Sequence, residues 1–356
     1  MLLDYNKKEL EDLGRLYGVK GVSKLKKAEL VDALAECIPS NMSSGLVMLN
    51  TQDLQLFEEI LAKDKLVNDE VQGLDYYSLA ELGLVNLGQT KDGEVLSVDN
   101  RIKQAYKKIN HTAIKEQVKI NSGIRAHIMG LLNLYGAVEI AWTCELYLRD
   151  HSDHLSEKQL IDFVKKDRLL SNRSQIEGDY IAEETIYSID VKNLYDFIKV
   201  TRNKPYYVPT KEYIELVSDE AYYDNTLQVQ NLKSYIKKNF TQDPDTIEEA
   251  VLAVIMITRV DCDKDGTTIT LMLEEWSYMG IEIKDLKQAN ETVKHIVSVM
   301  NTTRKWINRG YTPQELSPNI VRSKKGTKVT KLDVGRNALC SCGSGKKYKN
   351  CCGKPK

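Results

Sequence analysis

Apolar residues recur every three or four positions along most of the chain, and this period predicts amphipathic helices. The pattern occurs twice within residues 1–39. Asp4 is placed to cap the first helix, Gly18 is placed to end it, and Pro39 stops the second helix. The apolar positions of the two helices are Leu10, Leu13, Leu16, Leu30, Leu34 and Ile38. We therefore expect a compact helical module at residues 1–39.

Residues 46–189 combine helical periods with short alternating segments, which are typical of strands. Two helices are expected at about 51–65 and 76–82, and a hairpin with its turn at Asp92-Gly93 follows them. Helix, helix and hairpin is the order of a winged helix. We therefore expect a winged-helix-like unit in this part of the chain.

A second unit of similar order is expected at Gly123–Ile189, after a long helix that Asp99 is placed to cap. Its helices are expected at 125–136, 137–148 and 157–167, ahead of a strand-like segment. The third helix would enter the DNA groove of a winged helix, but it carries acidic residues among its basic ones. Because acids oppose phosphate, we favour a winged-helix-like fold that packs against protein.

Residues 190–316 keep the helical period, with an interruption at 206–209, and the last helix is expected to end at Gly310. Residues 317–334 follow with five Lys or Arg residues and a glycine. This segment is typical of a flexible basic linker, which spans on the order of 20 Å as a coil.

Four of the seven cysteines lie close together near the C-terminus. Cys340 and Cys342 form a C-x-C pair, and Cys351 and Cys352 form an adjacent pair after eight residues. Soft thiolates at this spacing suit a tetrahedral zinc ion, and a loop with two glycines gives the chain freedom to turn between the pairs. The alternative is two disulfides or idle thiols, but adjacent cysteines are poorly placed to bridge each other. The spacing therefore predicts a zinc site.

The segment CSCGSGKKYKNCC resembles the SEC-C motif, the zinc-binding tail of the SecA preprotein translocase motor. The resemblance covers about 20 residues and implies that the four cysteines are zinc ligands. It also implies a docking element for a chaperone such as SecB or for the ribosome. The phosphate-binding loop of an ATPase is absent from the sequence. The patterns together predict a mainly α fold: a multi-helical body with short winged-helix-like hairpins and a small zinc knuckle at 335–356.

The pattern KxxLxKAELVDAL in the first 39 residues resembles the N-terminal module of the Rho termination factor and SAP-like modules. Such modules often touch nucleic acid, and the residues placed for a phosphate contact are Lys20, Lys24, Lys26 and Lys27. However, the module has seven basic and seven acidic residues. A protein-docking or purely structural cap is the alternative.

Charge is unevenly distributed along the chain. The formal net charge is −1, but residues 322–356 contain eleven Lys or Arg residues and one acid, which leaves −11 on residues 1–321. Such a tail favours phosphate or an acidic protein face. The tail residues expected to contact a partner are Arg336, Lys346, Lys347, Tyr348 and Lys349.

The sequence gives only weak indications of a second metal site or of a catalytic site. The run D-x-D-x-D-G from Asp261 to Gly266 resembles half a calcium loop, but Met272 stands where a bidentate carboxylate is needed, so an acidic turn is favoured. His151 and His154 lie in an acidic loop before a helix start, where capping and solvation explain them better than a metal. Cys144 lies in an apolar helix and is expected in the core. No nucleophile elbow, kinase set or H-E-x-x-H motif occurs, so an enzyme is less favoured.

No apolar run approaches the ~20 residues that span a bilayer, the N-terminus is acidic, and the other cysteines are scattered, so we expect a cytoplasmic protein. Our hypothesis is a non-enzymatic adaptor whose body recognises a client and whose tail docks a chaperone or the ribosome. The alternative hypothesis is a regulator that binds DNA or RNA through the Rho-like start and the basic tail.

Overall fold

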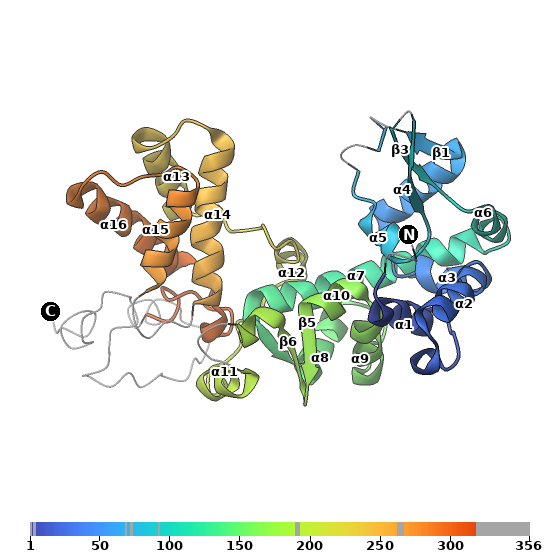
Figure 1. Cartoon of the computed structure of the whole chain (residues 1–356). Coiled ribbons are helices and arrows are strands. Elements are labelled where there is room, and N and C mark those ends of the chain that lie inside the picture. The colour runs from blue at the N-terminus through green and yellow to red at the C-terminus, as the bar shows by residue number, and fades with distance from the viewer. Residues whose placement is uncertain are drawn as a thin grey trace. The chain divides into compact units, whose positions relative to one another are not determined.

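The computed structural model describes residues 2, 5–67, 70–71, 74–91, 93–188, 193–261 and 267–317. The chain divides into two compact units, Met1–Arg125 and Ala126–Lys356 (Figure 1). The described part is mainly helical, with two small sheets, which confirms the predicted mainly α character. The predicted zinc knuckle lies outside the described residues.

The first unit contains short helices and one three-stranded sheet. Its elements are α1 (Lys7–Leu16), η1 (Val22–Lys24), α2 (Lys27–Ser40), α3 (Met42–Leu46), α4 (Thr51–Lys63), β1 (Lys65–Val67), α5 (Tyr77–Glu81), β2 (Asn86–Thr90), β3 (Gly93–Ser97) and α6 (Asn100–Tyr106). The division between the units falls inside α7 (His111–Tyr135).

One hydrophobic core runs through the first unit. Leu10 of α1, Leu34 of α2 and Phe57 of α4 are fully buried in the same cluster. The hydroxyl of Tyr17 reaches across this core and donates to the carbonyl oxygen of Leu82 at 2.8 Å. Thus the helices of residues 1–39 pack with later elements of the unit, and the predicted five-part division of the chain stays a proposal.

Two local predictions in the first unit were wrong. The N-cap of α1 is Asn6 rather than Asp4, because the Asn6 side chain accepts from the backbone N–H of Glu9 at 3.0 Å. Asp99 does cap a helix, but that helix, α6, is short rather than long. Helix α6 ends at Tyr106. The side chain of Asn110 caps the next helix, α7, by accepting from the backbone N–H of Ala113 at 3.1 Å.

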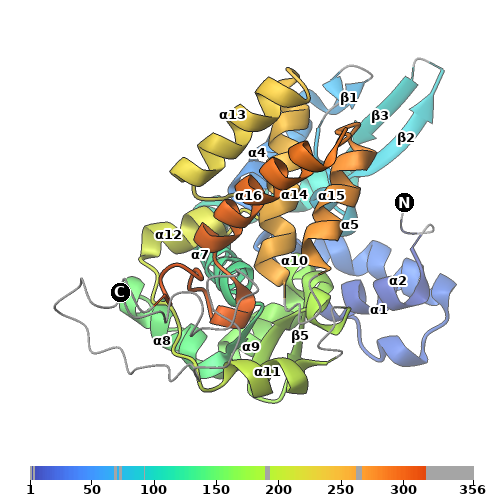
Figure 2. The ribbon, with the colours of Figure 1, turned by 90° about the vertical axis from the view of Figure 1, so that its left-hand side faces the viewer.

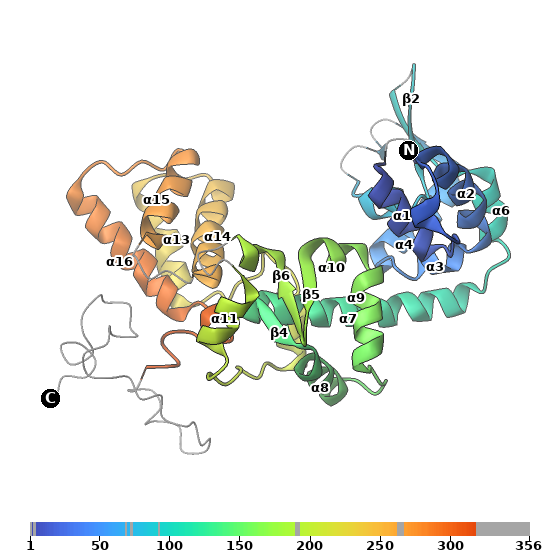
Figure 3. The same cartoon turned by 60° about the horizontal axis from the view of Figure 1, so that its bottom comes forward.

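The second unit contains a small sheet with its helices and a helical bundle. Its elements after α7 are β4 (Ala137–Glu139), α8 (Ile140–Asp150), α9 (Glu157–Lys166), α10 (Arg168–Arg173), β5 (Ser174–Glu177), β6 (Tyr180–Glu183), η3 (Glu184–Tyr187), α11 (Leu194–Thr201), α12 (Lys211–Val217), α13 (Leu227–Asn239), α14 (Pro244–Val260), α15 (Thr268–Tyr278), α16 (Leu286–Thr302) and η4 (Trp306–Asn308) (Figure 3).

Residues 137–139 were predicted to be helical but form strand β4. Gly136 has a left-handed backbone, with φ +70°, and ends α7. The strand that follows pairs antiparallel with β6, where Val138 lies opposite Ile181. A partner distant in the sequence therefore overrides the local helical period.

The two sheets share one topology. Each is antiparallel and has the order first strand, third strand, second strand: β1-β3-β2 and β4-β6-β5. In each, one or more helices separate the first strand from a hairpin. The predicted hairpin around residues 92–93 is confirmed, and the segment predicted to be strand-like forms the β5–β6 hairpin. The winged-helix assignment stays a prediction.

Helices α13 to α16 form the bundle of the second unit (Figure 2). Helix α13 packs against α14 and α16, and α14 packs against α15. Trp276 is fully buried at the centre and donates from Nε1 to the carbonyl oxygen of Ala250 at 2.9 Å. The last helix ends at Thr302 and not at Gly310, because Thr303 has an extended backbone.

Candidate functional site

The predicted zinc ligands and tail contacts lie outside the described residues. These are Arg336, Cys340, Cys342, Lys346, Lys347, Tyr348, Lys349, Cys351 and Cys352. Their chemistry rests on the sequence. The described residues provide two further places to examine: the lysines of the first unit and a cavity in the second.

The four lysines of the first module lie around the start of α2. Lys24 ends η1, Lys26 is the N-cap of α2 and Lys27 is its first residue, while Lys20 precedes η1. All four side chains are exposed. The carboxylate of Glu29 accepts from the N–H of Lys26 at 2.7 Å, so an acid already occupies part of this helix start. The structure thus places the four lysines along one short surface segment, where a polyanion could reach them.

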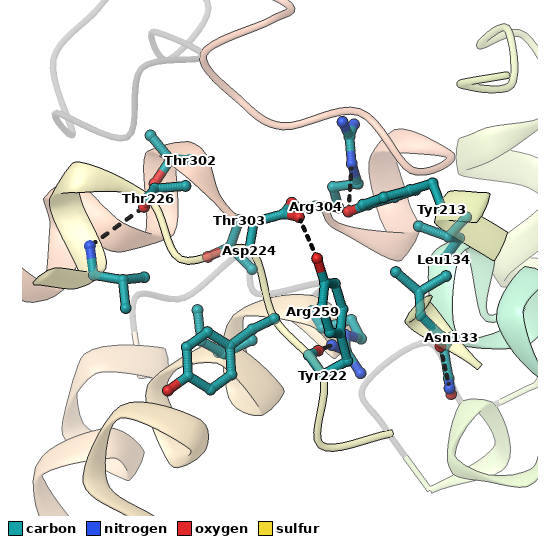
Figure 4. A pocket seen from close by; sticks show the side chains of 14 residues that line it. Asn133, Leu134, Tyr213, Tyr222, Asp224, Thr226, Arg259, Thr302, Thr303 and Arg304 are labelled. Carbon is teal, nitrogen blue, oxygen red and sulfur yellow. Dashed lines mark hydrogen bonds between the residues drawn. The ribbon is translucent and has the colours of Figure 1, made fainter. Parts of the chain in front are cut away.

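The cavity of the second unit lies where α7, α12, α13, α14 and α16 meet, and its volume is about 30 Å³ (Figure 4). Polar groups concentrate along it. The polar residues of the lining are Asn133, Tyr213, Tyr222, Tyr223, Asp224, Thr226, Arg259, Thr302, Thr303 and Arg304. None of them was singled out from the sequence, because they come from five segments separated by up to about 170 positions.

Arg304 is held on several sides within this lining. Its guanidinium carbon lies 3.6 Å from the centroid of the Tyr207 ring, and its Nε donates to the Tyr213 hydroxyl at 3.1 Å. Its Nη1 donates to the Gly310 carbonyl oxygen at 2.8 Å and to the Glu315 carboxylate at 3.0 Å. Arg304 is therefore a neutralised, structural cation.

Arg259 has different partners. Its two terminal nitrogens donate to the carbonyl oxygens of Glu220 and Tyr222, at 3.1 and 2.9 Å. Asp224 lies in the same lining, but its carboxylate accepts instead from the hydroxyls of Tyr213 and Tyr222. Burial lowers the pKa of Arg259, although the charges around Tyr213, Glu220 and Asp224 act in the opposite direction.

The titratable side chains Tyr213, Tyr222 and Asp224 of this lining are engaged in hydrogen bonds with one another. Burial raises the pKa of the Tyr213 phenol well above its ordinary value, so it stays protonated and donates a hydrogen bond. The described lining contains neither a histidine nor a cysteine that could serve as a base or nucleophile. The cavity therefore presents hydrogen-bonding side chains and the guanidinium group of Arg259.

The described parts of the two other candidate metal sites are engaged in protein contacts. Asp261 accepts from the Thr268 hydroxyl at 2.8 Å and pairs with Lys305 at 2.5 Å, while Asp263, Asp265 and Gly266 lie outside the described residues. The His151 ring stacks on Tyr147 with 4.1 Å between centroids. His154 is exposed. Among the described residues, no three His, Cys, Asp or Glu side chains gather as a metal site would require.

A second polar cluster, also missed from the sequence, surrounds Glu139 at the end of β4. Its carboxylate accepts from the hydroxyls of Tyr206 and Tyr180 and from Arg309. The Arg309 guanidinium also lies over the Tyr206 ring, 4.1 Å from its centroid. Burial raises the pKa of Glu139, but hydrogen bonds from the two tyrosines and the charge of Arg309 outweigh it and lower this pKa below its ordinary value. Because every charge here has a partner, the cluster stabilises the fold.

The comparisons with known proteins give one family match, at the C-terminal end of the chain. The sequence profile of the SEC-C motif matches residues 336–354, which include all four clustered cysteines. The protein translocase subunit SecA of Clostridium novyi is 43% identical over 68 residues, which are 18% of this chain and 8% of that protein. The SecA subunit of Alkaliphilus oremlandii is 57% identical over 42 residues, 12% of this chain and 5% of that protein.

A longer alignment is more distant. The SecA subunit of Clostridium botulinum (strain Hall) is 25% identical over 231 residues, 59% of this chain and 27% of that protein. The chain thus spans 5–27% of the length of these three curated relatives. No solved structure is significantly similar to the chain. None of the helices in the described ranges has the length and apolar character of a membrane span.

Proposed function

We propose that the chain is a non-enzymatic adaptor of the bacterial cytoplasm that docks a partner through a zinc-bound C-terminal motif, while its helical body recognises a client. The observation that carries this proposal is the SEC-C match at residues 336–354. Since the motif covers a small part of the chain, it supports a docking element and does not identify the client. The partner we expect is a chaperone with an acidic surface, such as SecB, or the ribosome.

The donor set of the motif fits zinc. Cys340, Cys342, Cys351 and Cys352 supply four thiolates, and soft sulfur ligands in a set of four favour Zn²⁺ over hard cations. These four residues would hold the ion, which would order a segment that is too short to bury a core. The role of the metal in this proposal is structural.

The charge of the tail supports docking through electrostatic attraction. Residues 322–356 carry a formal charge of +10, and four thiolates with one Zn²⁺ would leave about +8. A basic segment of this kind is attracted to an acidic protein surface or to ribosomal RNA, and the attraction weakens as salt screens it. Lys346 and Lys347 lie between the two cysteine pairs and are the natural positions to test.

The test is co-sedimentation with purified bacterial ribosomes and pull-down with purified SecB, each at low and high salt. We expect Lys346→Glu with Lys347→Glu to weaken the complex by about tenfold or more. The matched control is Lys237→Glu with Lys238→Glu, which makes the same charge change at two exposed positions of α13. Equal loss in both double variants, or no binding of either partner at low salt, would contradict the docking proposal.

A nucleic-acid-binding regulator is the second candidate, and one observation favours it. Lys20, Lys24, Lys26 and Lys27 are all exposed within eight residues. A protein that neutralises several phosphates should lose affinity steeply as salt rises. We would measure the retention of random single-stranded RNA and duplex DNA in gels at low salt, with Lys24→Glu and Lys27→Glu as variants. Absence of any retained complex at low salt would remove this candidate.

A further inference from the structure

The cavity of the second unit holds a positive charge that none of the described carboxylates neutralises at ion-pair distance. Arg259 donates to two backbone carbonyls and makes a weak contact with the sulfur of Met256. Arg304, by comparison, pairs with Glu315. We propose that this cavity is a binding site for the carboxylate group of a small organic acid, with Arg259 as the residue that recognises it.

The hydrogen-bond capacity of Arg259 is only partly used. A guanidinium has five N–H donors in a planar fork that matches a carboxylate in bidentate geometry. The two carbonyl bonds, to Glu220 and Tyr222, engage one donor on each terminal nitrogen. The remaining donors therefore suit an acceptor that enters the cavity, which Arg259 lines.

The hydrogen bonds in the lining leave Arg259, rather than Asp224, to interact with a ligand. Asp224 is the carboxylate in the lining, and the hydroxyls of Tyr213 and Tyr222 already donate to it. Burial lowers the pKa of Arg259, which means that its surroundings do not fully compensate the buried positive charge. A bound carboxylate would supply the missing compensation.

The N-terminus of α13 also favours an anion in the cavity. Thr226, the N-cap of the 13-residue helix α13, and Val229 in its first turn both line the cavity. The N-terminus of a helix carries a partial positive charge and favours anions. The helix end and Arg259 come from different segments and act in the same direction on an anion between them.

The size of the cavity selects the kind of ligand. A volume of about 30 Å³ holds roughly two water-sized groups, which matches the two oxygens of a carboxylate and excludes a nucleotide. The apolar part of the lining consists of Leu134, Val217, Val229 and Ile255. These side chains lie beside the carboxylate position, and a short aliphatic chain attached to it would extend from the open side of the cavity.

The experiment is a titration of the full-length protein with sodium propionate, followed by saturation-transfer NMR and by the melting temperature, with sodium chloride at equal ionic strength as reference. We expect saturable binding and a rise in melting temperature with propionate but not with chloride. Arg259→Met should abolish this response. The matched control is Arg202→Met, at the exposed C-cap residue of α11, and this variant should leave the response intact.

Arg259 also holds the loop before α13, so Arg259→Met could fail to fold. Arg259→Lys keeps the charge but loses the planar fork, and we expect it to weaken propionate binding by about tenfold. Unchanged binding in Arg259→Lys, or no saturable binding of propionate to the wild type, would overturn the proposal. A titration with inorganic phosphate forms the second arm, and tighter binding of phosphate than of propionate would overturn the carboxylate assignment.

Discussion

The guanidinium group of Arg304 lies over the ring of Tyr207, with 3.6 Å between the guanidinium carbon and the ring centroid. The same group donates to the carbonyl oxygen of Gly310 and to the carboxylate of Glu315. One side chain therefore connects the extended segment at 206–209 with the last described segment of the chain. A backbone hydrogen bond from the Tyr207 N–H to the Arg309 carbonyl oxygen, at 2.9 Å, joins the same two segments.

Removing the Arg304 contacts should destabilise the second unit. Arg304→Met would leave the Glu315 carboxylate without its cation and would remove the side-chain donor to the Gly310 carbonyl. We expect a loss of about 2–4 kcal/mol in the free energy of unfolding. The control is Arg202→Met, at an exposed position, for which we expect a change within about 0.5 kcal/mol. Urea unfolding followed by circular dichroism measures both. Equal stability of the two variants would show that the Arg304 contacts contribute little.

Alanine substitutions at two glycines with positive φ should distinguish the cost of backbone strain from the cost of a steric clash. Gly136 has φ +70°, and a Cβ there would lie 2.5 Å from the Trp306 ring. Gly178 has φ +58° but no atom within 4 Å of its Cβ position. We expect Gly178→Ala to cost about 1–2 kcal/mol and Gly136→Ala about 3 kcal/mol or more in the free energy of unfolding. A similar loss in both variants would mean that Trp306 moves aside easily.

The stability of the second unit should fall as pH is lowered from about 6.5 to 4. His127 is buried, and this burial lowers its pKa to about 4, against the effect of its contact with the Thr143 carbonyl. Because the unfolded chain binds the proton first, the contribution is complete above pH 6.5 and is lost as the pH falls through 4. The difference from the ordinary value of 6.5 corresponds to about 3 kcal/mol.

The histidine variants test this assignment. His127→Gln should reduce the dependence of the unfolding free energy on pH between 7 and 4.5, since glutamine keeps an N–H donor but does not titrate. His154 is exposed, so His154→Gln should retain the wild-type dependence. If the two variants give the same pH profile, another group dominates the acid response.

Metal removal should affect the tail and leave the body intact. We expect one zinc ion per chain by elemental analysis, and loss of that ion in the double variant Cys340→Ser with Cys351→Ser. Cys37 lies partly buried in the first unit, outside the motif, and Cys37→Ser should keep the zinc. A strong chelator should leave the melting temperature of the body unchanged, because its described cores consist of apolar side chains. Metal-free wild-type protein would refute the zinc assignment.

The hydroxyl of Tyr17 provides a test of how the first unit is divided. Tyr17→Phe would leave the buried carbonyl of Leu82 without its donor, at an expected cost of about 1–3 kcal/mol. If residues 1–125 unfold together, all probes of that unit should shift by the same amount. The control is Tyr195→Phe at an exposed position. A separate, earlier transition for residues 1–39 would instead support an independent first module.

The sequence alone determined the mainly helical character of the chain, the first hairpin, the strand-like character of the second and the cysteine motif at the C-terminus. These features depend on period, turn chemistry or spacing within a few residues, so they can be read from neighbouring positions. The start of the helix predicted over 137–148 was wrong for the opposite reason: residues 137–139 form β4 because β6, more than 40 residues later, pairs with them.

Tertiary structure alone decided the polar cavity and its charges. Asn133, Asp224, Arg259 and Arg304 lie on segments that carry no motif, and nothing in their spacing links them. Whether an arginine is neutralised depends on which carboxylate folds against it: Glu315 reaches Arg304, and none of the described carboxylates reaches Arg259 at ion-pair distance. The local pattern of apolar and polar residues determines most helices and hairpins. Contacts between residues distant in the sequence determine which charges in the cavity are neutralised.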